Sequence, residues 1–239
     1  MENKICIALD IPDLDQIKKI ATQLHVKVGW FKINSAFTRN GPPLVKYLKS
    51  LGTKLFMDLK FHDIPNTVAN YATEMTEMGV DMFNVHASGG FEMMQAARIA
   101  ADTTAERLKI SRPKIIAVTV LTSMDMENLN SVSVLKTPEE QVLTLARLAK
   151  QAGLDGVVAS AKEAKLLRGE FGPDFLIVTP GIRLTNQLNS KQGLNDQKRI
   201  VTPKIAVESG ANILVIGRPI TEAENKELAI AKIIDEFPK

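Results

Sequence analysis

Eight short apolar runs, each followed by an amphipathic stretch, dominate this sequence of 239 residues. The runs that we expect to form strands lie at 4–10, 27–34, 54–60, 81–87, 114–121, 156–160, 175–182 and 213–217. The stretches that predict helices lie near 13–24, 41–51, 64–78, 90–108, 138–152, 161–171, 202–209 and 224–236. Near-continuous apolar strands predict a parallel sheet whose outer face is covered by helices. Eight such units in a row predict a closed (β/α)8 TIM barrel, an α/β fold, rather than an open sheet.

Four helix-to-strand joints carry a glycine where the helix should end: SLGTKLF, EMGVDMF, QAGLDGVV and ESGANILV. Glycine adopts the left-handed backbone conformation without a Cβ clash, so we interpret Gly52, Gly79, Gly153 and Gly210 as helix stops. The chain has no linker and no low-complexity segment. Residues 1–239 are therefore expected to form a single barrel domain.

The composition argues against several classes of protein. The formal net charge is only +3 and the basic residues are scattered, so nucleic acid is not expected as a partner. The N-terminus lacks the basic and apolar regions of a signal peptide, and no apolar run approaches the roughly 20 residues that span a bilayer. The single cysteine, Cys6, excludes a disulfide framework and is interpreted as a small core residue. We expect a soluble, cytoplasmic protein with no membrane partner.

The third expected strand carries charges where a barrel of this kind places its active site, at the C-terminal strand ends. It ends KLFMDLK and continues FHDIPNTV. Because side chains alternate along a strand, Asp58 and Lys60 share one face with Phe56, and the apolar Leu55 and Met57 should face the helices. A buried ion pair in the barrel mouth is not expected for stability alone, although a packed salt bridge is the alternative interpretation.

Further charges should converge on the same mouth. Asp63 follows on the loop before Pro65, where it either joins the site or caps the next helix, and the two roles are compatible. The first strand ends in Asp10, and Lys32 lies near the end of the second. Two lysines beside two or three carboxylates predict a network that perturbs proton affinities and holds one ammonium ready to deliver a proton.

The last two strands end in residues suited to a phosphate group. The eighth run ends ILVIGRPIT, in which Gly217 would let a phosphate approach the backbone and Arg218 would donate to its oxygens. The seventh ends VTPGIR, which offers Gly181 and Arg183. Barrels of this type often bind phosphate at these two strand ends, so both arginines together predict a phosphate site, whereas either alone could be a solvated charge.

The remaining strand ends offer weaker signals. Thr122 and Ser123 follow the fifth run, where their hydroxyls could bind a ligand or stabilise a turn. His86 ends the fourth and is interpreted as a hydrogen-bonded histidine within the barrel rather than a catalytic base. The three histidines show no metal-ligand spacing, and the chain has no dinucleotide or P-loop motif. We expect no catalytic metal and no cofactor.

Together these motifs resemble those of the orotidine 5′-monophosphate decarboxylases of the bacterial type. DLKFHDIPNTV at 58–68 resembles the signature of that family. The resemblance extends along nearly the whole chain, in order: ALD at 8–10, FKIN at 31–34, NVHASGG at 84–90, VTVLTS at 118–123, TPGIR at 179–183, DQKR at 196–199 and IGRPIT at 216–221. One difference is the segment 184–196, which is longer than in many bacterial relatives and has Leu184 where proline is common.

The resemblance implies the decarboxylation of orotidine 5′-monophosphate to uridine 5′-monophosphate, the last step of de novo pyrimidine nucleotide synthesis, by a homodimer. Lys60 would donate a proton to C6 of the pyrimidine, within a charge array formed with Lys32, Asp58 and Asp63. Asp63 and Thr67 would reach in from the second subunit. The implied substrate contacts are Asp10, Lys32 and Thr67 at the ribose, Thr122 and Ser123 at the ring, and Arg183, Gln197, Gly217 and Arg218 at the phosphate.

Two alternatives remain open from the sequence. A metal-dependent sugar-phosphate lyase or synthase could use the shorter motif DxKxxD to bind Mg²⁺. A non-catalytic protein could bind uridine monophosphate without turning over orotidine monophosphate. Chelation of metal distinguishes the first alternative from the decarboxylase, and an assay of turnover distinguishes the second.

Overall fold

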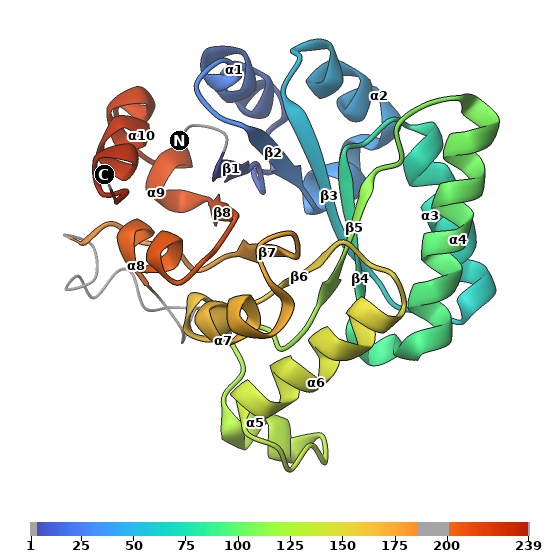
Figure 1. Ribbon diagram of the computed structural model, residues 1–239. Coiled ribbons are helices and arrows are strands. Elements are labelled where there is room, and N and C mark those ends of the chain that lie inside the picture. Colours follow the sequence, from blue (N-terminus) through green and yellow to red (C-terminus); the bar gives the residue numbers. More distant parts are fainter. Residues whose placement is uncertain (1–3, 186–200, 239) are drawn as a thin grey trace.

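A computed structural model describes residues 4–185 and 201–238 of the chain. Its strands close into a parallel barrel in chain order, with β8 hydrogen-bonded to β1 (Figure 1). The strands are β1 (Ile5–Ala8), β2 (Trp30–Ile33), β3 (Lys54–Phe61), β4 (Met82–His86), β5 (Lys114–Val118), β6 (Gly156–Val158), β7 (Leu176–Thr179) and β8 (Ile213–Ile216). The predicted (β/α)8 barrel is confirmed.

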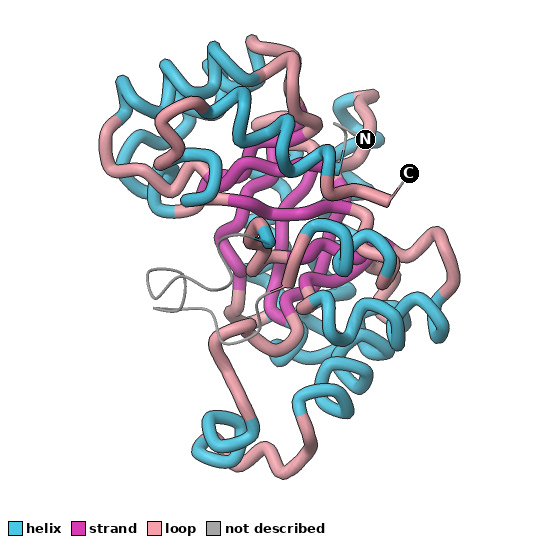
Figure 2. The backbone as a smooth tube through the Cα atoms, turned by 90° about the vertical axis from the view of Figure 1, so that its left-hand side faces the viewer, coloured by secondary structure: helices cyan, strands magenta, loops and turns pink. Residues whose placement is uncertain are grey.

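The helices pack around the outside of this barrel, so that the strands form the centre of the molecule (Figure 2). All of the predicted helices except the one after β2 lie within two residues of their predicted bounds. The helices are α1 (Leu14–Leu24), α2 (Ser35–Ser50), α3 (Pro65–Glu77), α4 (Gly90–Leu108), α5 (Met126–Ser131), α6 (Pro138–Gln151), α7 (Ala161–Phe171), α8 (Pro203–Glu208), α9 (Arg218–Thr221) and α10 (Lys226–Asp235), with a 3₁₀ turn η2 (Ala87–Gly89).

Several short elements depart from the prediction. The helix expected from residue 41 begins at Ser35, because a first helical segment precedes a kink at Gly41, whose φ is 60° and ψ is −154°. The Gly-Pro-Pro sequence at this kink obscures the earlier turn, since proline cannot donate a backbone hydrogen bond. The short helices α5 and α9 and the turn η2 were not predicted. Each is too short to carry a periodic apolar pattern.

Two apolar layers hold the barrel together. One fills the barrel interior and consists of Cys6, Trp30, Phe56, Met82, Ile116, Val178, Ile213 and Val215. The other lies between sheet and helices and includes Leu55 and Met57, which are fully buried. Phe56 therefore points inward and its neighbours point outward, as the alternation predicts. Cys6 is a core residue, and burial raises the pKa of its thiol far above the usual range.

The helix stops lie at the glycines that the sequence identifies. Gly52, Gly79, Gly153 and Gly210 have φ angles of 80°, 69°, 80° and 99°. In each case the glycine directly follows the residue that caps the helix. The left-handed conformation lets the chain turn back into the next strand without a Cβ clash.

At the amino ends of the strands, three side chains join neighbouring strands through hydrogen bonds that we call the amino-end ties. In each tie, the residue just before an even-numbered strand accepts a backbone N–H from the preceding odd-numbered strand. The distances are 2.7 Å from Leu55 N to Asp81 Oδ2, 2.8 Å from Ile115 N to Asp155 Oδ2, and 2.8 Å from Ile177 N to Asn212 Oδ1. Gly29 has the equivalent place before β2, where its own N–H donates to Ile5 O.

Candidate active site

A cavity of about 790 Å³ opens at the C-terminal ends of the strands. Its volume is typical of sites for small molecules. Seven strands contribute to its walls, and its apolar floor is made of Ala8, Phe56, Val118, Val158, Val178 and Val215. Charged residues from β2, from β3 and from the loop after β1 line one part of it, and Gly181, Arg183, Gly217 and Arg218 also line it. The cavity thus combines an apolar floor, a group of charged side chains near the ends of the first three strands, and glycines and arginines after the last two strands that could bind a phosphate.

The predicted charges from the first three strands form one connected array. Lys32 Nζ lies 2.8 Å from Asp10 Oδ2 and 2.9 Å from Asp58 Oδ2. The second oxygen of Asp58 accepts a hydrogen bond from Lys60 Nζ at 2.8 Å. The structure therefore brings together four of the residues that the sequence places at the mouth: Asp10, Lys32, Asp58 and Lys60.

The two lysines differ in exposure. The side chain of Lys32 is 7% exposed, whereas that of Lys60 is 32% exposed and lines the cavity. Lys32 is thus held inside the array, and Lys60 has a free approach to a ligand. Of the two ammonium groups, Lys60 is the better placed to meet a reacting atom.

The array favours the charged forms of Lys32 and Asp58. Burial opposes the charged form of Lys32, but Asp58 and Asp10 outweigh that effect and raise the pKa of Lys32. Burial likewise disfavours the carboxylate of Asp58, yet Lys32 and Lys60 together lower the pKa of Asp58 below its usual range. Opposite charges at hydrogen-bonding distance favour both ionised forms. A fixed negative charge thus stands beside the ammonium of Lys60.

Strand β3 reaches this geometry through a backbone irregularity. Met57 pairs with Phe83 and Phe61 pairs with Val85, so β3 has two more residues than β4 between these pairs. Lys60 lies in this bulge with a φ of 53°, a conformation that a lysine rarely adopts. The backbone N–H of Lys60 donates to Asn84 Oδ1 at 2.7 Å, and Asn84 Nδ2 donates to Asp58 Oδ1 at 2.6 Å.

Asn84 is a residue that the sequence analysis did not single out. It is fully buried on β4, in the run MFNVH, where it is the one polar residue before the terminal histidine. Its place two residues after the inward-pointing Met82 would have put it on the inner face of the barrel. That position inside an apolar run was the available signal.

The predicted phosphate residues lie at the cavity, apart from one that the structure does not describe. Arg183 is buried and donates from Nη1 to the carbonyl of Ile182 at 2.9 Å. Arg218 is exposed and begins α9 directly after Gly217. Thr122, which is buried, and Ser123, which is exposed, line the wall after β5. Gln197 lies outside the described residues, as does most of the segment 184–196.

Asp63 and Thr67 lie outside this cavity. Asp63 is exposed, and its Oδ1 accepts the backbone N–H of Ile64 at 2.7 Å. The interpretation of Asp63 as a helix cap is wrong, because Ile64 occupies the N-cap position of α3. Thr67 is half-buried in the first turn of the same helix. Their predicted entry into the site of a second subunit stays a prediction.

His86 is hydrogen-bonded, as expected. Its Nδ1 lies 3.0 Å from Ser88 Oγ, and its ring stacks on His62 at a centroid distance of 5.4 Å. Burial, with smaller effects from His62 and Lys60, lowers the pKa of His86. Among the described residues, no group of three or more His, Cys, Asp or Glu side chains is arranged to hold a metal ion. Within the same part of the chain, no helix is both long and apolar enough to cross a membrane.

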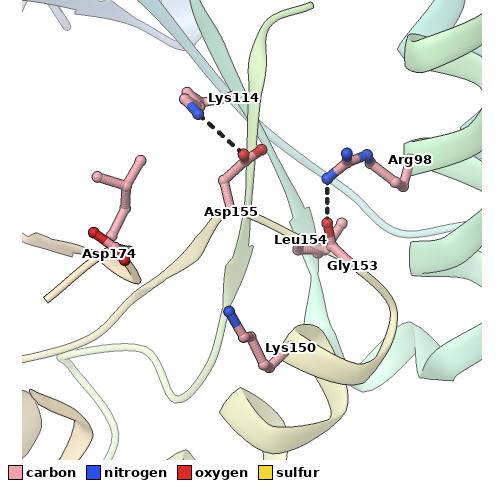
Figure 3. Close-up of a pocket in the computed structure, with 8 residues that line it drawn as sticks. Arg98, Lys114, Lys150, Gly153, Leu154, Asp155 and Asp174 are labelled. Carbon is pink, nitrogen blue, oxygen red and sulfur yellow. Dashed lines mark hydrogen bonds and ion pairs between the residues drawn. The ribbon is translucent and has the colours of Figure 1, made fainter. Parts of the chain in front are cut away.

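A second cavity, of about 280 Å³, lies at the amino ends of the strands (Figure 3). Three of its basic side chains and Asp155 are engaged with the protein itself. Lys114 Nζ lies 3.2 Å from Asp155 Oδ1, Arg98 donates to the carbonyl of Gly153, and Lys150 lies 5.5 Å from the centre of the Phe175 ring. The active sites of such barrels form at the other end, so we interpret this cavity as part of the structural base.

Comparison with known proteins agrees with this geometry. Residues 3–233 match the family described as "Orotidine 5'-phosphate decarboxylase / HUMPS family". The orotidine 5′-phosphate decarboxylase of Pseudoalteromonas translucida is 52% identical over 235 residues, 96% of this chain and 95% of that protein. The enzyme of the same name from Moorella thermoacetica is 48% identical over 238 residues, 99% of this chain and 92% of its own.

Solved structures give the same result. The crystal structure of orotidine 5′-phosphate decarboxylase from Lactobacillus acidophilus is 37% identical, with a TM-score of 0.82 over 98% of this chain and 99% of that one. An uncharacterized conserved protein from Geobacillus kaustophilus is 34% identical, with a TM-score of 0.83 over 98% of this chain and all of its own. The chain belongs to the orotidine 5′-phosphate decarboxylase / HUMPS family.

Proposed function

We propose that the protein is a carboxy-lyase that converts orotidine 5′-monophosphate to uridine 5′-monophosphate, the last step of de novo pyrimidine nucleotide synthesis, with Lys60 as the proton donor. The observation that carries this proposal is the array of Asp10, Lys32, Asp58 and Lys60 at one side of an apolar-floored cavity. The names of the two relatives described above support the same substrate. A decarboxylase without an electron-accepting cofactor would need such a site, because its side chains must stabilise the carbanion.

The substrate would span the cavity from the array to the last strands. The phosphate would lie at Arg183, Gln197, Gly217 and Arg218, and the pyrimidine ring beside Thr122 and Ser123. Asp10, Lys32 and Thr67 would contact the ribose hydroxyls. The apolar floor suits the faces of a ring, and the arginine guanidinium groups match phosphate oxygens in shape and charge.

The reaction follows from the position of Lys60. The bond between C6 and the carboxylate carbon breaks, CO2 leaves, and the electron pair stays on C6. The ammonium of Lys60 stabilises that charge and then transfers its proton to C6, which leaves Lys60 as a neutral amine until it is reprotonated from solvent. Protein side chains supply the electrostatics of each step, so we propose that neither metal nor cofactor takes part.

Electrostatic attraction alone does not account for the catalysis. Two unit charges about 4 Å apart interact by roughly 4 kcal/mol at an effective dielectric constant near 20. Enzymes typically lower barriers by about 8–23 kcal/mol. Binding energy from the remote phosphate would supply much of the difference by ordering the site around the reacting carbon. Repulsion between Asp58 and the departing carboxylate would add to it by raising the energy of the bound substrate.

The activity is tested by adding orotidine 5′-monophosphate to the purified protein and following the loss of orotate-ring absorbance. We expect turnover that EDTA leaves unchanged. Loss of activity with EDTA, restored by Mg²⁺, would instead favour a metal-dependent lyase or synthase. Tight binding of uridine monophosphate without any turnover would favour a non-catalytic nucleotide-binding protein.

Replacement of Arg218 by alanine is expected to raise KM about 10- to 100-fold, because it removes a charge-assisted contact of about 1.5–3 kcal/mol with the phosphate. Steady-state kinetics measure the change. Arg147→Ala is the matched control, since Arg147 lies exposed on α6 and pairs with Glu170 at 2.7 Å, away from the cavity. An unchanged KM in Arg218→Ala would contradict the proposed phosphate site.

Asp63 and Thr67 would complete the site of the partner subunit in a homodimer. Mixing inactive Lys60→Ala with inactive Asp63→Ala under conditions that exchange subunits should then restore activity. A one-to-one mixture yields half heterodimers with one intact site each, so about a quarter of the wild-type activity is expected. If the two residues served the same subunit, every site would lack one of them and the mixture would stay inactive.

A further inference from the structure

We infer that Asn84 is a positioning residue for the decarboxylation, which sets both the orientation of Asp58 and the backbone of Lys60. The inference rests on the proposed role of Lys60 as proton donor. Asn84 is fully buried on β4 and bonds to both residues. It does not line the cavity, so it acts through its neighbours and not on the substrate.

The amide of Asn84 fills the bulge in β3. At this point β3 carries two more residues than β4 between adjacent pairs, so the regular ladder of backbone hydrogen bonds is interrupted. The N–H of Lys60 donates to the side-chain oxygen of Asn84 at 2.7 Å instead. That bond supports the left-handed backbone of Lys60, which would otherwise cost about 1 kcal/mol or more. It thus helps to hold the base of the Lys60 side chain in place.

The same amide selects one oxygen of Asp58. Its Nδ2 donates to Oδ1 at 2.6 Å, the oxygen that also accepts from Lys60 Nζ, while Oδ2 accepts from Lys32. With Oδ1 held by two donors and Oδ2 by a third, the carboxylate plane has one orientation. The direction of the Lys60 ammonium is then set by both its partner and its backbone.

An amide has the required pair of groups at this position whatever the pH. It must accept a hydrogen bond from a backbone N–H and donate one to a carboxylate, and the two polar ends of asparagine do both. An ionised aspartate would accept but could not donate, and it would place a second negative charge beside Asp58. Leucine has a similar volume but forms neither bond.

Asn84→Leu is expected to lower kcat by about 10²-fold, the usual effect of a displacement of roughly 1 Å in a catalytic group. KM should stay within about threefold of the wild type, because the phosphate contacts are untouched. Asn212→Leu is the matched control. Asn212 also joins two strands, because its Oδ1 accepts from Ile177 N of β7, but it does so at the opposite end of the barrel. The same oxygen accepts from Arg168 Nη2 of helix α7. Its variant should melt at a lower temperature with an unchanged kcat.

The Asn84→Asp variant tests whether the two hydrogen bonds of Asn84, rather than its volume, support kcat. The measurement is the dependence of kcat on pH. The introduced carboxyl group would face Asp58 and Lys60 on β3, with Lys32 of β2 beyond them, and burial next to Asp58 would raise its pKa. While protonated it could accept from Lys60 N–H and donate to Asp58, as the amide does. We expect kcat to fall as the pH rises through this new ionisation, in a pH range where the wild-type kcat does not fall.

The outcomes distinguish a failure of the inference about Asn84 from a failure of the proposed role of Lys60. A wild-type kcat in Asn84→Leu, or an equal loss of kcat in Asn212→Leu at equal loss of melting temperature, would overturn the inference. So would a uniformly low kcat in Asn84→Asp with no new ionisation. If Lys60→Ala is inactive while Asn84→Leu is fully active, the proposed function stands and only this inference fails. If Lys60→Ala is active, the proposed role of Lys60 itself fails.

Discussion

Lys60→Ala should lose at least about 10⁴-fold in kcat, because it removes the proposed proton donor, which would also be the cation nearest to the developing carbanion. The barrel should remain folded. The side chain of Lys60 is about one-third exposed, and Asp58 keeps its second partner Lys32 at 2.9 Å. We therefore expect a stability within about 1 kcal/mol of the wild type. Loss of orotate-ring absorbance and a thermal melt measure the two quantities.

Lys54→Ala is the control for that variant. Lys54 lies on the same strand, exposed at its amino end, where its Nζ is 5.3 Å from the centre of the Trp30 ring. Its replacement should leave turnover unchanged. Wild-type-like turnover in Lys60→Ala, with Lys54→Ala equally active, would remove Lys60 from the mechanism.

Asp58→Asn should be damaged in both activity and stability. The neutral amide no longer balances Lys32 and Lys60, so kcat is expected to fall by about 10²- to 10³-fold. Lys32 is then left buried with only Asp10 as its ionic partner in the array. Breaking a buried ion pair from one side costs about 3 kcal/mol or more, which in a chain of this length lowers the melting temperature by roughly 6–12 °C.

This stability difference should depend on pH. The pKa of Asp58 is lowered in the folded protein, so its contribution is complete above the unfolded value of about 3.9 and is lost as the pH falls through the folded pKa. Wild type and Asp58→Asn should therefore differ fully at pH 7 and converge in strong acid. Denaturant unfolding at a series of pH values measures the gap. A gap that widens on acidification would contradict this assignment.

Asp155→Asn provides the comparison for Asp58. The two carboxylates are equally buried, with side chains 11% and 12% exposed, and both bind two cationic side chains. Asp155 pairs with Arg112 and Lys114 at the amino ends of the strands. Its variant should lose stability and keep its kcat. A loss of kcat in both variants would mean that instability, not the charge at position 58, accounts for the effect.

The regular parts of this fold could be predicted because each obeys a local rule. Alternation along β3 places Phe56 in the barrel and Leu55 against the helices, and the glycines after four helices have the left-handed conformation that their positions demand. The meeting of the strand-end charges could also be predicted, but from the symmetry of the barrel rather than from a local pattern. In a closed parallel barrel, residues far apart in the chain meet if they occupy equivalent strand ends.

The irregular parts could not be predicted from local rules. Lys60 has a positive φ although nothing in its own sequence requires one, because the bond to Asn84 on another strand supports it. The first segment of α2 was missed because it precedes the kink at Gly41, where the Gly-Pro-Pro sequence interrupts the helical pattern. Asp63 bonds to its own neighbour and lies outside the cavity of its own chain, and its predicted place in the site of a second subunit stays a prediction.

The amino-end ties lie at the end of the barrel opposite the cavity. The ties join three pairs of strands there, through Asp81, Asp155 and Asn212. Each of these residues also binds a basic side chain, which is Lys49, Arg112 or Arg168 respectively. These ties therefore stabilise the amino end of the barrel without involving the residues of the proposed chemistry. Substitutions at the C-terminal strand ends can change the specificity while the ties at the amino ends still stabilise the barrel. The pair of β1 and β2 lacks such a tie, because Gly29 has no side chain, so a side-chain acceptor introduced there could stabilise the barrel further.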